Sequence, residues 1–381
     1  MSTAINRATL HENEQIMLWE LKKTESHKYQ LPKTIKGISL FTGAGGMDVG
    51  FKKAGIDVTL ANELVPYACD TYEANHPGTK LLRGDIKDYM DVFTEGSADI
   101  VFGGPPCQGF SVAGKMDPDD ERSKLIWSYL DVIERVRPKL FVMENVKALG
   151  TLEKWKPIRD RYLERTRKLG YCCHYFLLNS SDFGVSQNRE RVFFIGSQKE
   201  YEPTALLQEL KKLKKAPLSL RQLLSSLPPA GSEGNPLTCT AKITLASNPV
   251  MRRSPYAGMI FNGLGRPLNL DGVSATLPAS MGGNKTPIID SKLLEDPDAH
   301  DWVIDYHSKL WNKTEEPQFG SAPDRLRRLT IVESAAIQSF PTDYKFQGSK
   351  SAIYTQIGNA VPCKLAECVA KAIMEFFYIK G

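Results

Sequence analysis

The sequence predicts an α/β fold in which a largely parallel sheet, with helices on both faces, is followed by a smaller irregular domain. Between residue 37 and about residue 196, short apolar runs alternate with stretches of helical apolar spacing, which is typical of strand–helix repeats. From 216 to 325 the chain is instead rich in Pro, Gly, Ser and Asn, which favours short strands and loops. A helical period returns near residue 326, so we expect the chain to re-enter the first domain at its C-terminus.

The elements of the first domain follow in chain order from apolar runs and helix-ending residues. Proline stands at the start and end of the second predicted helix, and Gly170 closes the fourth, as expected at helix boundaries. The predicted strands are GISLF (37–41), VTLANE (58–63), ADIVF (98–102), KLFVMENV (139–146), CHYFLLN (173–179) and RVFFIG (191–196). The predicted helices are a short one ending at Ala54-Gly55, then 66–77, 122–136, 152–169 and, at the C-terminus, 364–378.

These changes of pattern divide the chain into four segments. Residues 1–36 are polar and charged and form an N-terminal extension, with one amphipathic stretch around 13–23. Residues 37–200 form the sheet domain, 201–325 form the irregular domain, and 326–381 form a segment that returns to the sheet domain.

Basic residues gather in the irregular domain. The net charge of the chain is +5, yet residues 211–289 hold ten basic residues against only Glu233 and Asp271. This stretch therefore carries +8 and the rest of the chain carries −3. A basic stretch in a mildly acidic chain suits contact with phosphates, although a solvated surface with a lysine-rich helix at 205–215 explains the same charges.

Composition excludes several classes of protein. No apolar run approaches the ~20 residues that cross a membrane, and the N-terminus lacks the apolar core of a signal peptide, so we expect a cytoplasmic protein. The seven cysteines are odd in number and show no CxxC spacing. This usage favours reduced thiols over disulfides, and no metal site is expected.

The segment GGPPCQGFS at 103–111 directly follows a predicted strand and carries a thiol. Pro105 and Pro106 have fixed φ angles and no backbone N–H, so the segment is a rigid loop rather than a helix or a central strand. A thiol held rigidly at the edge of a sheet suits a nucleophile, which makes Cys107 a candidate. Taken alone, the same residues also fit a turn that happens to hold a small buried cysteine.

A glycine-rich turn, FTGAGGMDVGF, follows the first predicted strand and lets a ligand approach the backbone. Asp48 occupies the position where a dinucleotide-binding GxGxxG loop needs its third glycine, so this is not the standard NAD loop. Glu63 ends the next strand, where its two oxygens suit ribose hydroxyls, and Asp85 in RGDI suits an adenine amino group. Each element alone also fits a generic turn or strand-end acid.

Two further motifs stand at strand ends. Glu144, in ENV, ends the strand after the Cys107 loop, and the carboxyl ends of neighbouring parallel strands face one crevice. A thiolate and a carboxyl group side by side form a nucleophile and acid pair, unless the glutamate only caps a helix. In QNRER, Arg189 and Arg191 are two residues apart, so on a strand they point to one face and suit a carbonyl oxygen or a phosphate. An ordinary salt-bridged edge is the alternative for this pair.

In this order the motifs resemble those of the DNA cytosine-5 methyltransferase family: FTGAGG, NE, GDI, GGPPCQGFS, ENV, QNRER, RRLTIVESAAIQSFP and QIGNAVP. The resemblance covers roughly 37–200 and 326–375, with the variable region of the family at 201–325, and PPCQGFS with ENV and QNRER is highly specific. It implies a Rossmann-like S-adenosylmethionine-dependent methyltransferase domain with a smaller, irregular target-recognition domain across a DNA cleft. The recognition region is short, which implies a single target sequence.

The resemblance also implies roles for individual residues. Cys107 would attack C6 of a flipped-out cytosine, Glu144 would bond its N3 and amino group, and Arg191 would contact its O2 carbonyl with Arg189 in support. The residues implied to line the cofactor pocket are Phe41, Gly43, Gly45, Gly46, Glu63, Asp85, Ile86, Pro106, Leu125 and Asn359. Those implied to contact DNA are Gln108, Ser111, Arg252, Arg253 and, in an element that resembles the family's Thr-Leu segment, Thr276, Leu277, Gly282, Gly283 and Asn284.

The partners implied by the resemblance are S-adenosyl-L-methionine and double-stranded DNA. We expect a monomeric prokaryotic or phage enzyme of a restriction-modification system, located with the nucleoid, whose cognate restriction endonuclease acts separately. A transfer-RNA cytosine-5 methyltransferase of the same family is one alternative, although the basic irregular domain favours DNA. A catalytically silent DNA-binding homologue is another, but such a protein should have lost Cys107, Glu144 or the cofactor glycines, which are all present.

Overall fold

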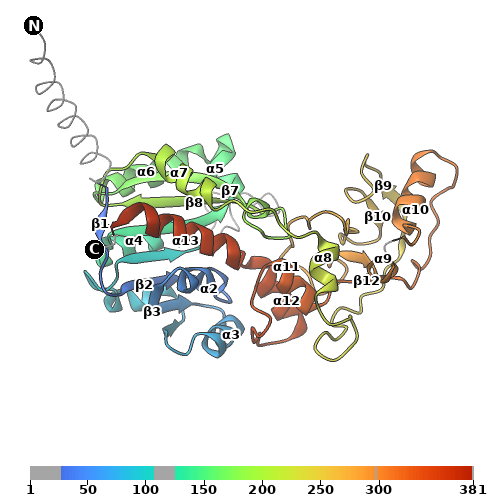
Figure 1. Ribbon diagram of the computed structural model, residues 1–381, viewed down its shortest axis with the longest axis horizontal. Helices are drawn as coiled ribbons and strands as arrows, with labels where there is room; N and C mark the ends of the chain where they lie inside the picture. Colours follow the sequence, from blue (N-terminus) through green and yellow to red (C-terminus); the bar gives the residue numbers. More distant parts are fainter. Residues whose placement is uncertain (1–26, 107–124, 297, 380–381) are drawn as a thin grey trace, which may run out of the picture.

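One seven-stranded sheet organises the larger part of the protein (Figure 1). The computed structural model describes residues 27–106, 125–296 and 298–379. In these residues the strand order is β4-β3-β2-β5-β6-β8-β7. The strands are β2 (Ile35–Leu40), β3 (Ile56–Glu63), β4 (Lys80–Arg83), β5 (Ile100–Gly103), β6 (Leu140–Val146), β7 (Cys172–Asn179) and β8 (Glu190–Ser197). All neighbours are parallel except that β8 runs antiparallel to β6 and β7, so the predicted α/β fold with a largely parallel sheet is confirmed.

Helices cover both faces of this sheet because successive residues of a strand point to opposite sides. In β5, Ile100 and Phe102 belong to one apolar cluster and Val101 belongs to the other. The first face carries α2 (Gly46–Lys53), α7 (Pro203–Lys212) and α13 (Cys363–Phe377), and the second carries α4 (Leu125–Val136) and α6 (Lys156–Lys168). The central strands are buried on both faces, which explains why their sequences read as continuous apolar runs.

The helix predicted at 152–169 is divided into shorter elements. It comprises the 3₁₀ turn η3 (Glu153–Trp155) and α6, which has proline in its first turn, and a separate short helix, α5 (Lys147–Thr151), precedes them. Proline is tolerated there because the first N–H groups of a helix have no intrahelical partner. The remaining elements of the sheet region are α3 (Pro66–Asn75), the 3₁₀ turns η1 (Ile86–Val92) and η4 (Ser180–Asp182), and the parallel pair β1 (Tyr29–Gln30) and β13 (Tyr378–Ile379). Among the described residues, no helix combines the length and apolar character needed to cross a bilayer.

Residues 216–328, here called the small lobe, contain little regular structure and extend away from the sheet (Figure 1). The elements are α8 (Leu220–Ser225), α9 (Ser291–Glu295), α10 (Trp302–Trp311) and two antiparallel pairs, β9 (Leu245–Val250) with β10 (Met259–Phe261) and β11 (Ile288–Asp290) with β12 (Leu326–Arg328). Two bridging helices, α11 (Ile331–Ile337) and α12 (Lys350–Asn359), lie between lobe and sheet. They share an apolar core with Leu220, Leu277 and Leu329.

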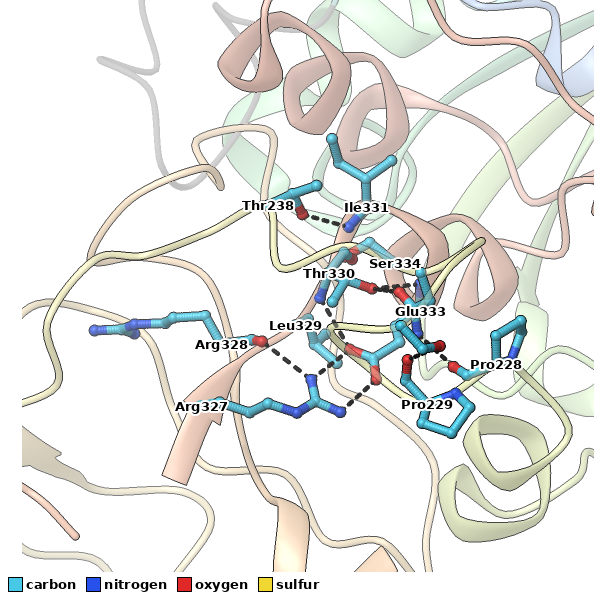
Figure 2. Close-up of polar contacts among 12 residues, drawn as sticks. Pro228, Pro229, Thr238, Arg327, Arg328, Leu329, Thr330, Ile331, Glu333 and Ser334 are labelled. Carbon is cyan, nitrogen blue, oxygen red and sulfur yellow. Dashed lines mark hydrogen bonds and ion pairs between the residues drawn. The ribbon is translucent and has the colours of Figure 1, made fainter. Parts of the chain in front are cut away.

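A buried polar cluster ties the small lobe to the first turn of α11 (Figure 2). Thr330 and Glu333 form a capping box, in which each side chain accepts from the backbone N–H of the other residue, at 3.1 and 2.9 Å. Arg327 donates to both carboxylate oxygens of Glu333, at 2.8 and 2.6 Å. The Thr330 hydroxyl also donates to Oδ1 of Asn235 at 2.6 Å. The start of α11 is therefore fixed to two separate segments of the lobe.

Candidate functional site

The carboxyl ends of three neighbouring strands bring the predicted site residues to one edge of the sheet. Leu40 of β2 pairs with Gly103 of β5, and Gly103 pairs with Met143 of β6. The glycine loop after Leu40, the GGPP loop from Gly103 and the side chain of Glu144 therefore leave the sheet next to one another. The three predicted site residues that lie outside the described part of the chain are Cys107, Gln108 and Ser111.

Glu144 is held at this edge by an ion pair and by a close passage of the GGPP loop. Its Oε1 lies 2.9 Å from Nε of Arg191, and the two side chains are only 11% and 14% exposed. A Cβ on Gly104 would lie 2.9 Å from Oε2 of Glu144, so a glycine lets the loop pass this close to the carboxylate. Burial raises the pKa of Glu144, and the nearby guanidinium groups of Arg191 and Arg189 only partly oppose this effect. The carboxyl group is therefore fixed in place and takes up a proton more readily than an exposed glutamate.

The residue after Glu144 fixes the GGPP loop. Asn145 is 1% exposed, and its Nδ2 donates to the carbonyl oxygen of Pro105 at 3.2 Å. Sequence reasoning missed this residue, although it is the middle letter of ENV, because the motif does not show which backbone group an amide side chain reaches. Pro106, predicted to line the cofactor pocket, is half-buried at the end of the described part of this loop.

The two arginines of QNRER have different partners. β8 begins at Glu190, so Arg189 directly precedes the strand, and the guanidinium groups of both arginines act on the Glu144 carboxylate. Arg191 pairs with Glu144, whereas Arg189 donates to the carbonyl oxygens of Leu277 at 3.4 Å and Asn359 at 3.3 Å. Arg189 therefore connects the sheet edge to the small lobe and to the end of α12.

The glycine loop after β2 has an open face above Gly43. The φ angle of Gly43 is +54°, and a Cβ there would meet no atom within 4 Å. Its N–H donates to Oε2 of Glu63 at 2.7 Å, and Oε1 of Glu63 accepts from the N–H groups of Leu64 and Val65 at 3.0 and 2.8 Å. Burial raises the pKa of Glu63. Since Oε1 already accepts two bonds, Oε2 keeps the acceptor position that a ligand hydroxyl could use.

Three further predicted cofactor residues follow the ends of β2 and β4. Phe41 has a φ angle of +54°, a left-handed conformation that costs a non-glycine residue free energy. Gly45 has a φ angle of +78°, and a Cβ there would lie 2.5 Å from the His76 ring. Asp85 caps η1 by accepting from the N–H of Lys87 at 2.9 Å. The strained Phe41 backbone has no signal in the sequence.

The remaining predicted cofactor residues occupy more varied positions. Gly46 is buried, and a Cβ there would lie 2.6 Å from the carbonyl oxygen of Val361, so this glycine allows α2 to pack on the C-terminal segment. Ile86 is 2% exposed and belongs to the core beneath the sheet. Leu125 is half-buried at the start of α4, and Asn359 is exposed at the end of α12.

A buried pair of glutamines joins the sheet, the small lobe and the bridging helices. Nε2 of Gln187 donates to Oε1 of Gln338 at 3.0 Å, and both residues have no exposed surface. Oε1 of Gln187 accepts from the N–H of Leu277 at 2.8 Å, and Nε2 of Gln338 donates to the carbonyl oxygen of Ile357 at 2.7 Å. The Leu277 side chain is 1% exposed, so its backbone and its packing hold this segment in place. The glutamine pair was also missed by sequence reasoning.

The other predicted DNA contacts lie on exposed parts of the lobe. Thr276 is exposed, and its hydroxyl donates to the carbonyl oxygen of Asn188 at 2.8 Å. Arg252 and Arg253 are exposed, and neither forms an ion pair within the described ranges. Their loop is anchored on α10, where Nε2 of His307 donates to the carbonyl oxygen of Arg252 at 2.8 Å. The predicted glycine turn Gly282, Gly283 and Asn284 is partly to fully exposed.

A cavity of about 860 Å³ lies at the opposite edge of the sheet. Its lining includes Ile35, the first residue of β2, together with Ala54, Lys212 and Tyr378. It contains none of the predicted site residues, so we place the candidate site at the carboxyl-end edge, where Glu144, Arg191 and the two loops meet.

Comparison with known proteins shows the family to which the chain belongs. The family model for C-5 cytosine-specific DNA methylases matches residues 35–375. The chain is 32% identical over 348 residues to type II methyltransferase M1.HphI of Haemophilus parahaemolyticus, covering 89% of this chain and 86% of that protein. It is 33% identical over 351 residues to type II methyltransferase M.FnuDI of Fusobacterium nucleatum, covering 90% and 94%.

Solved structures show the same fold at lower identity. The Dnmt2 methyltransferase of S. pombe aligns with a TM-score of 0.61 and 18% identity, over 90% of this chain and 99% of that one. The methyltransferase EhMeth of Entamoeba histolytica aligns with a TM-score of 0.62 and 16% identity, over the same shares. By its match to the family model over nearly the whole sheet region and lobe, and by its bacterial relatives, this chain belongs to the C-5 cytosine-specific DNA methylase family.

Proposed function

We propose that this protein transfers a methyl group from S-adenosyl-L-methionine to C5 of a flipped-out cytosine in double-stranded DNA, through covalent addition of Cys107 to C6. The observation that carries the proposal is the position of Glu144. Its carboxyl group is buried, paired with Arg191 and passed by the GGPP loop at Gly104. This loop leads directly to Cys107.

The chemistry explains why these groups are needed together. C5 of cytosine is a weak nucleophile within an aromatic ring, and addition of a thiolate at C6 breaks the aromaticity and makes C5 enamine-like. Negative charge then develops toward N3, and a proton shared from Glu144 neutralises it. After methylation, a base or water takes the C5 proton, and the electron pair of the C5–H bond re-forms the C5–C6 double bond as the C6–S bond breaks and releases the Cys107 thiolate. A base stacked in a duplex cannot reach these groups, so the cytosine must leave the helix.

Arg191 supports this chemistry in two ways. Its guanidinium group fixes the Glu144 carboxyl at 2.9 Å, and its remaining donors suit the O2 carbonyl of the base. Burial raises the pKa of Glu144, so the group can hold a proton at a higher pH than an exposed glutamate. Arg189 acts indirectly, since its bonds to Leu277 and Asn359 hold the lobe and α12 against this edge.

The residues beside β2 fit the proposed cofactor. The open face of Gly43 leaves room for a ligand against the backbone, and Oε2 of Glu63 keeps one acceptor position for a ribose hydroxyl. Asp85, at the end of the next strand, suits the adenine amino group. When bound, S-adenosylmethionine supplies an electrophilic methyl group that the activated C5 can take up.

The small lobe would supply the DNA contacts and the choice of target. Its exposed Arg252 and Arg253 suit phosphates or base edges, and the anchored segment around Thr276 lies next to QNRER. We further propose a single DNA target, a monomeric enzyme in a bacterial cytoplasm, and a separately acting restriction endonuclease as its biological partner.

Bisulfite sequencing of DNA from cells that express the protein tests this function. We expect protected cytosines within one short recurring sequence in cells with the wild-type protein, and none in cells with Cys107→Ala. Incubation of the purified protein with labelled cofactor and either duplex DNA or transfer RNA separates the substrates. Methylation of RNA alone would contradict the proposal in favour of a transfer-RNA enzyme, and no methylation of either would favour a silent homologue.

A further inference from the structure

Side chains that the proposed chemistry does not use also bond the glycine loop that follows β2. The hydroxyl of Tyr344, from the segment between α11 and α12, donates to the carbonyl oxygen of Ala44. Its oxygen lies 3.1 Å from Nε2 of His76, which follows α3. Since the single Tyr344 proton goes to Ala44, Nε2 of His76 must carry the proton that it donates to Tyr344. Burial lowers the pKa of His76 to about 3, with Lys52 adding to the effect, so this ring is neutral at physiological pH.

His76 and Tyr344 lie directly against Gly45 of this loop. A Cβ on Gly45 would lie 2.5 Å from Nε2 of His76 and 2.9 Å from the hydroxyl of Tyr344. Gly45 has a φ angle of +78° and caps α2, and its N–H donates to the carbonyl oxygen of Thr42 at 2.9 Å. The two side chains therefore fill the space next to Gly45 that a larger residue would need.

A second polar contact fixes the helix that the loop enters. Asp48, in the first turn of α2, has no exposed surface and accepts from the hydroxyls of Ser39 at 2.9 Å and Tyr72 at 2.8 Å. Burial raises the pKa of Asp48 to about 6, so the two hydroxyls are its main compensation for lost water. The Tyr72 ring stacks on His76 with centroids 4.4 Å apart, which joins this contact to the first.

From this arrangement we propose that Tyr344, His76, Tyr72 and Asp48 are positioning residues that set the shape of the 42–46 loop and thereby the affinity for the cofactor. The inference rests on the proposed function, because it takes S-adenosylmethionine as the ligand of that loop. Two features favour positioning over simple packing. The chain of contacts ends on a backbone carbonyl of the loop itself, and it joins two segments, those of His76 and Tyr344, that lie 268 residues apart in sequence.

The test removes single hydroxyl groups and measures cofactor binding without turnover. In Tyr344→Phe we expect the Kd for S-adenosylmethionine, measured by calorimetry, to rise about five- to tenfold, as the loss of one hydrogen bond allows. At saturating cofactor, kcat should remain within about twofold of wild type. The matched control is Tyr201→Phe, which also removes a buried hydroxyl from a backbone carbonyl, that of Ile195 at 2.7 Å, but belongs to the core under α13.

A double variant shows whether the contacts act as a unit. Tyr72→Phe should also weaken cofactor binding, and in Tyr72→Phe/Tyr344→Phe the combined loss of binding free energy should be smaller than the sum of the single losses, because both act through one loop. Additive losses, or a Tyr344→Phe variant that binds the cofactor as the Tyr201→Phe control does, would overturn the inference. A wild-type protein that fails to bind S-adenosylmethionine would instead overturn the proposed function, and this inference with it.

Discussion

The sheet edge and the small lobe place their functional residues by different means. At the edge, the backbone register of parallel strands, whose carboxyl ends meet, brings together Glu144, Glu63 and the starting points of the two loops. In the lobe, two short antiparallel pairs leave most of the chain in loops, and side chains hold those loops by bonding backbone groups. Gln187 and Arg189 make contacts of this second kind, because both bond the backbone of Leu277 in the lobe.

This difference suggests a division of tasks. Because several strands share one hydrogen-bond register, residues at the strand ends keep fixed distances from one another, which suits chemistry between positioned groups. Loops held by a few side chains can change in sequence without altering the sheet, which suits a region that selects a DNA target. Substitutions at the edge should therefore affect the rate of methyl transfer, and substitutions in the lobe should affect stability and DNA binding.

The largest expected effect is that of Glu144→Gln at the sheet edge. The amide cannot give up a proton to N3 as the proposed role requires, so the rate constant of methyl transfer should fall about 10²- to 10⁴-fold while the Kd for the cofactor changes little. Single-turnover methyl transfer to duplex DNA measures this. Glu190→Gln is the control, because Glu190 lies on the same strand as Arg191 but makes an exposed ion pair with Lys147 at 2.8 Å. Equal effects of the two substitutions would contradict the assigned role.

The next effect concerns the attachment of the lobe. In Arg327→Met the buried Glu333 carboxylate, 3% exposed, loses its bidentate partner, so the free energy of unfolding should fall by about 3–5 kcal/mol. Arg83→Met is the control, since Arg83 also bonds two carboxylates, Asp70 and Glu73, but with all three side chains 41–51% exposed. In this control, the loss in the free energy of unfolding, measured by urea unfolding, should stay within about 1 kcal/mol. A loss of similar size for both would show that the cluster in Figure 2 does not hold the lobe.

A smaller effect is expected where the lobe touches α12. A Cβ on Gly358 would lie 2.6 Å from both the carbonyl oxygen of Pro278 and Cα of Ala279, and neither backbone atom can turn aside as a side chain would. Gly358→Ala should therefore lower the free energy of unfolding by about 1–3 kcal/mol and weaken DNA binding. Gly78→Ala, where a Cβ meets no atom within 4 Å, is the control for thermal and urea unfolding. A Gly358→Ala protein as stable as the control would argue against a close fit between lobe and helix.

The smallest effect is expected on the surface of the lobe. Replacing Arg252 or Arg253 by alanine should weaken duplex binding a few-fold, and each should reduce the slope of log K against log salt by about 0.9 if it contacts a phosphate. Lys211→Ala is the control, because this exposed lysine lies on α7, which packs on the sheet. Salt slopes that do not differ from those of Lys211→Ala would place the DNA elsewhere.

The same contrast explains how much the sequence could predict. Six of the seven described strands of the sheet were predicted within a few residues because buried strands read as apolar runs, whereas β4 was not among the predicted strands. Glu144 lies on the predicted strand, now β6, and its role stays a prediction. Asn145, Gln187 and Tyr344 were missed because each acts through a partner that is distant in sequence or is a backbone group. The common face expected for Arg189 and Arg191 stays a prediction, because Arg189 directly precedes the first residue of β8.

The most direct test of the central claim uses duplex DNA that carries 5-fluorocytosine at the methylated position. After methyl transfer, the fluorine on C5 cannot leave as a cation, so the thiol cannot be expelled and protein and DNA stay joined. We expect an adduct that survives denaturing electrophoresis, requires S-adenosylmethionine and maps to the peptide that contains Cys107. The absence of an adduct, or its mapping to one of the other six cysteines, would contradict covalent addition from the GGPPCQGFS loop.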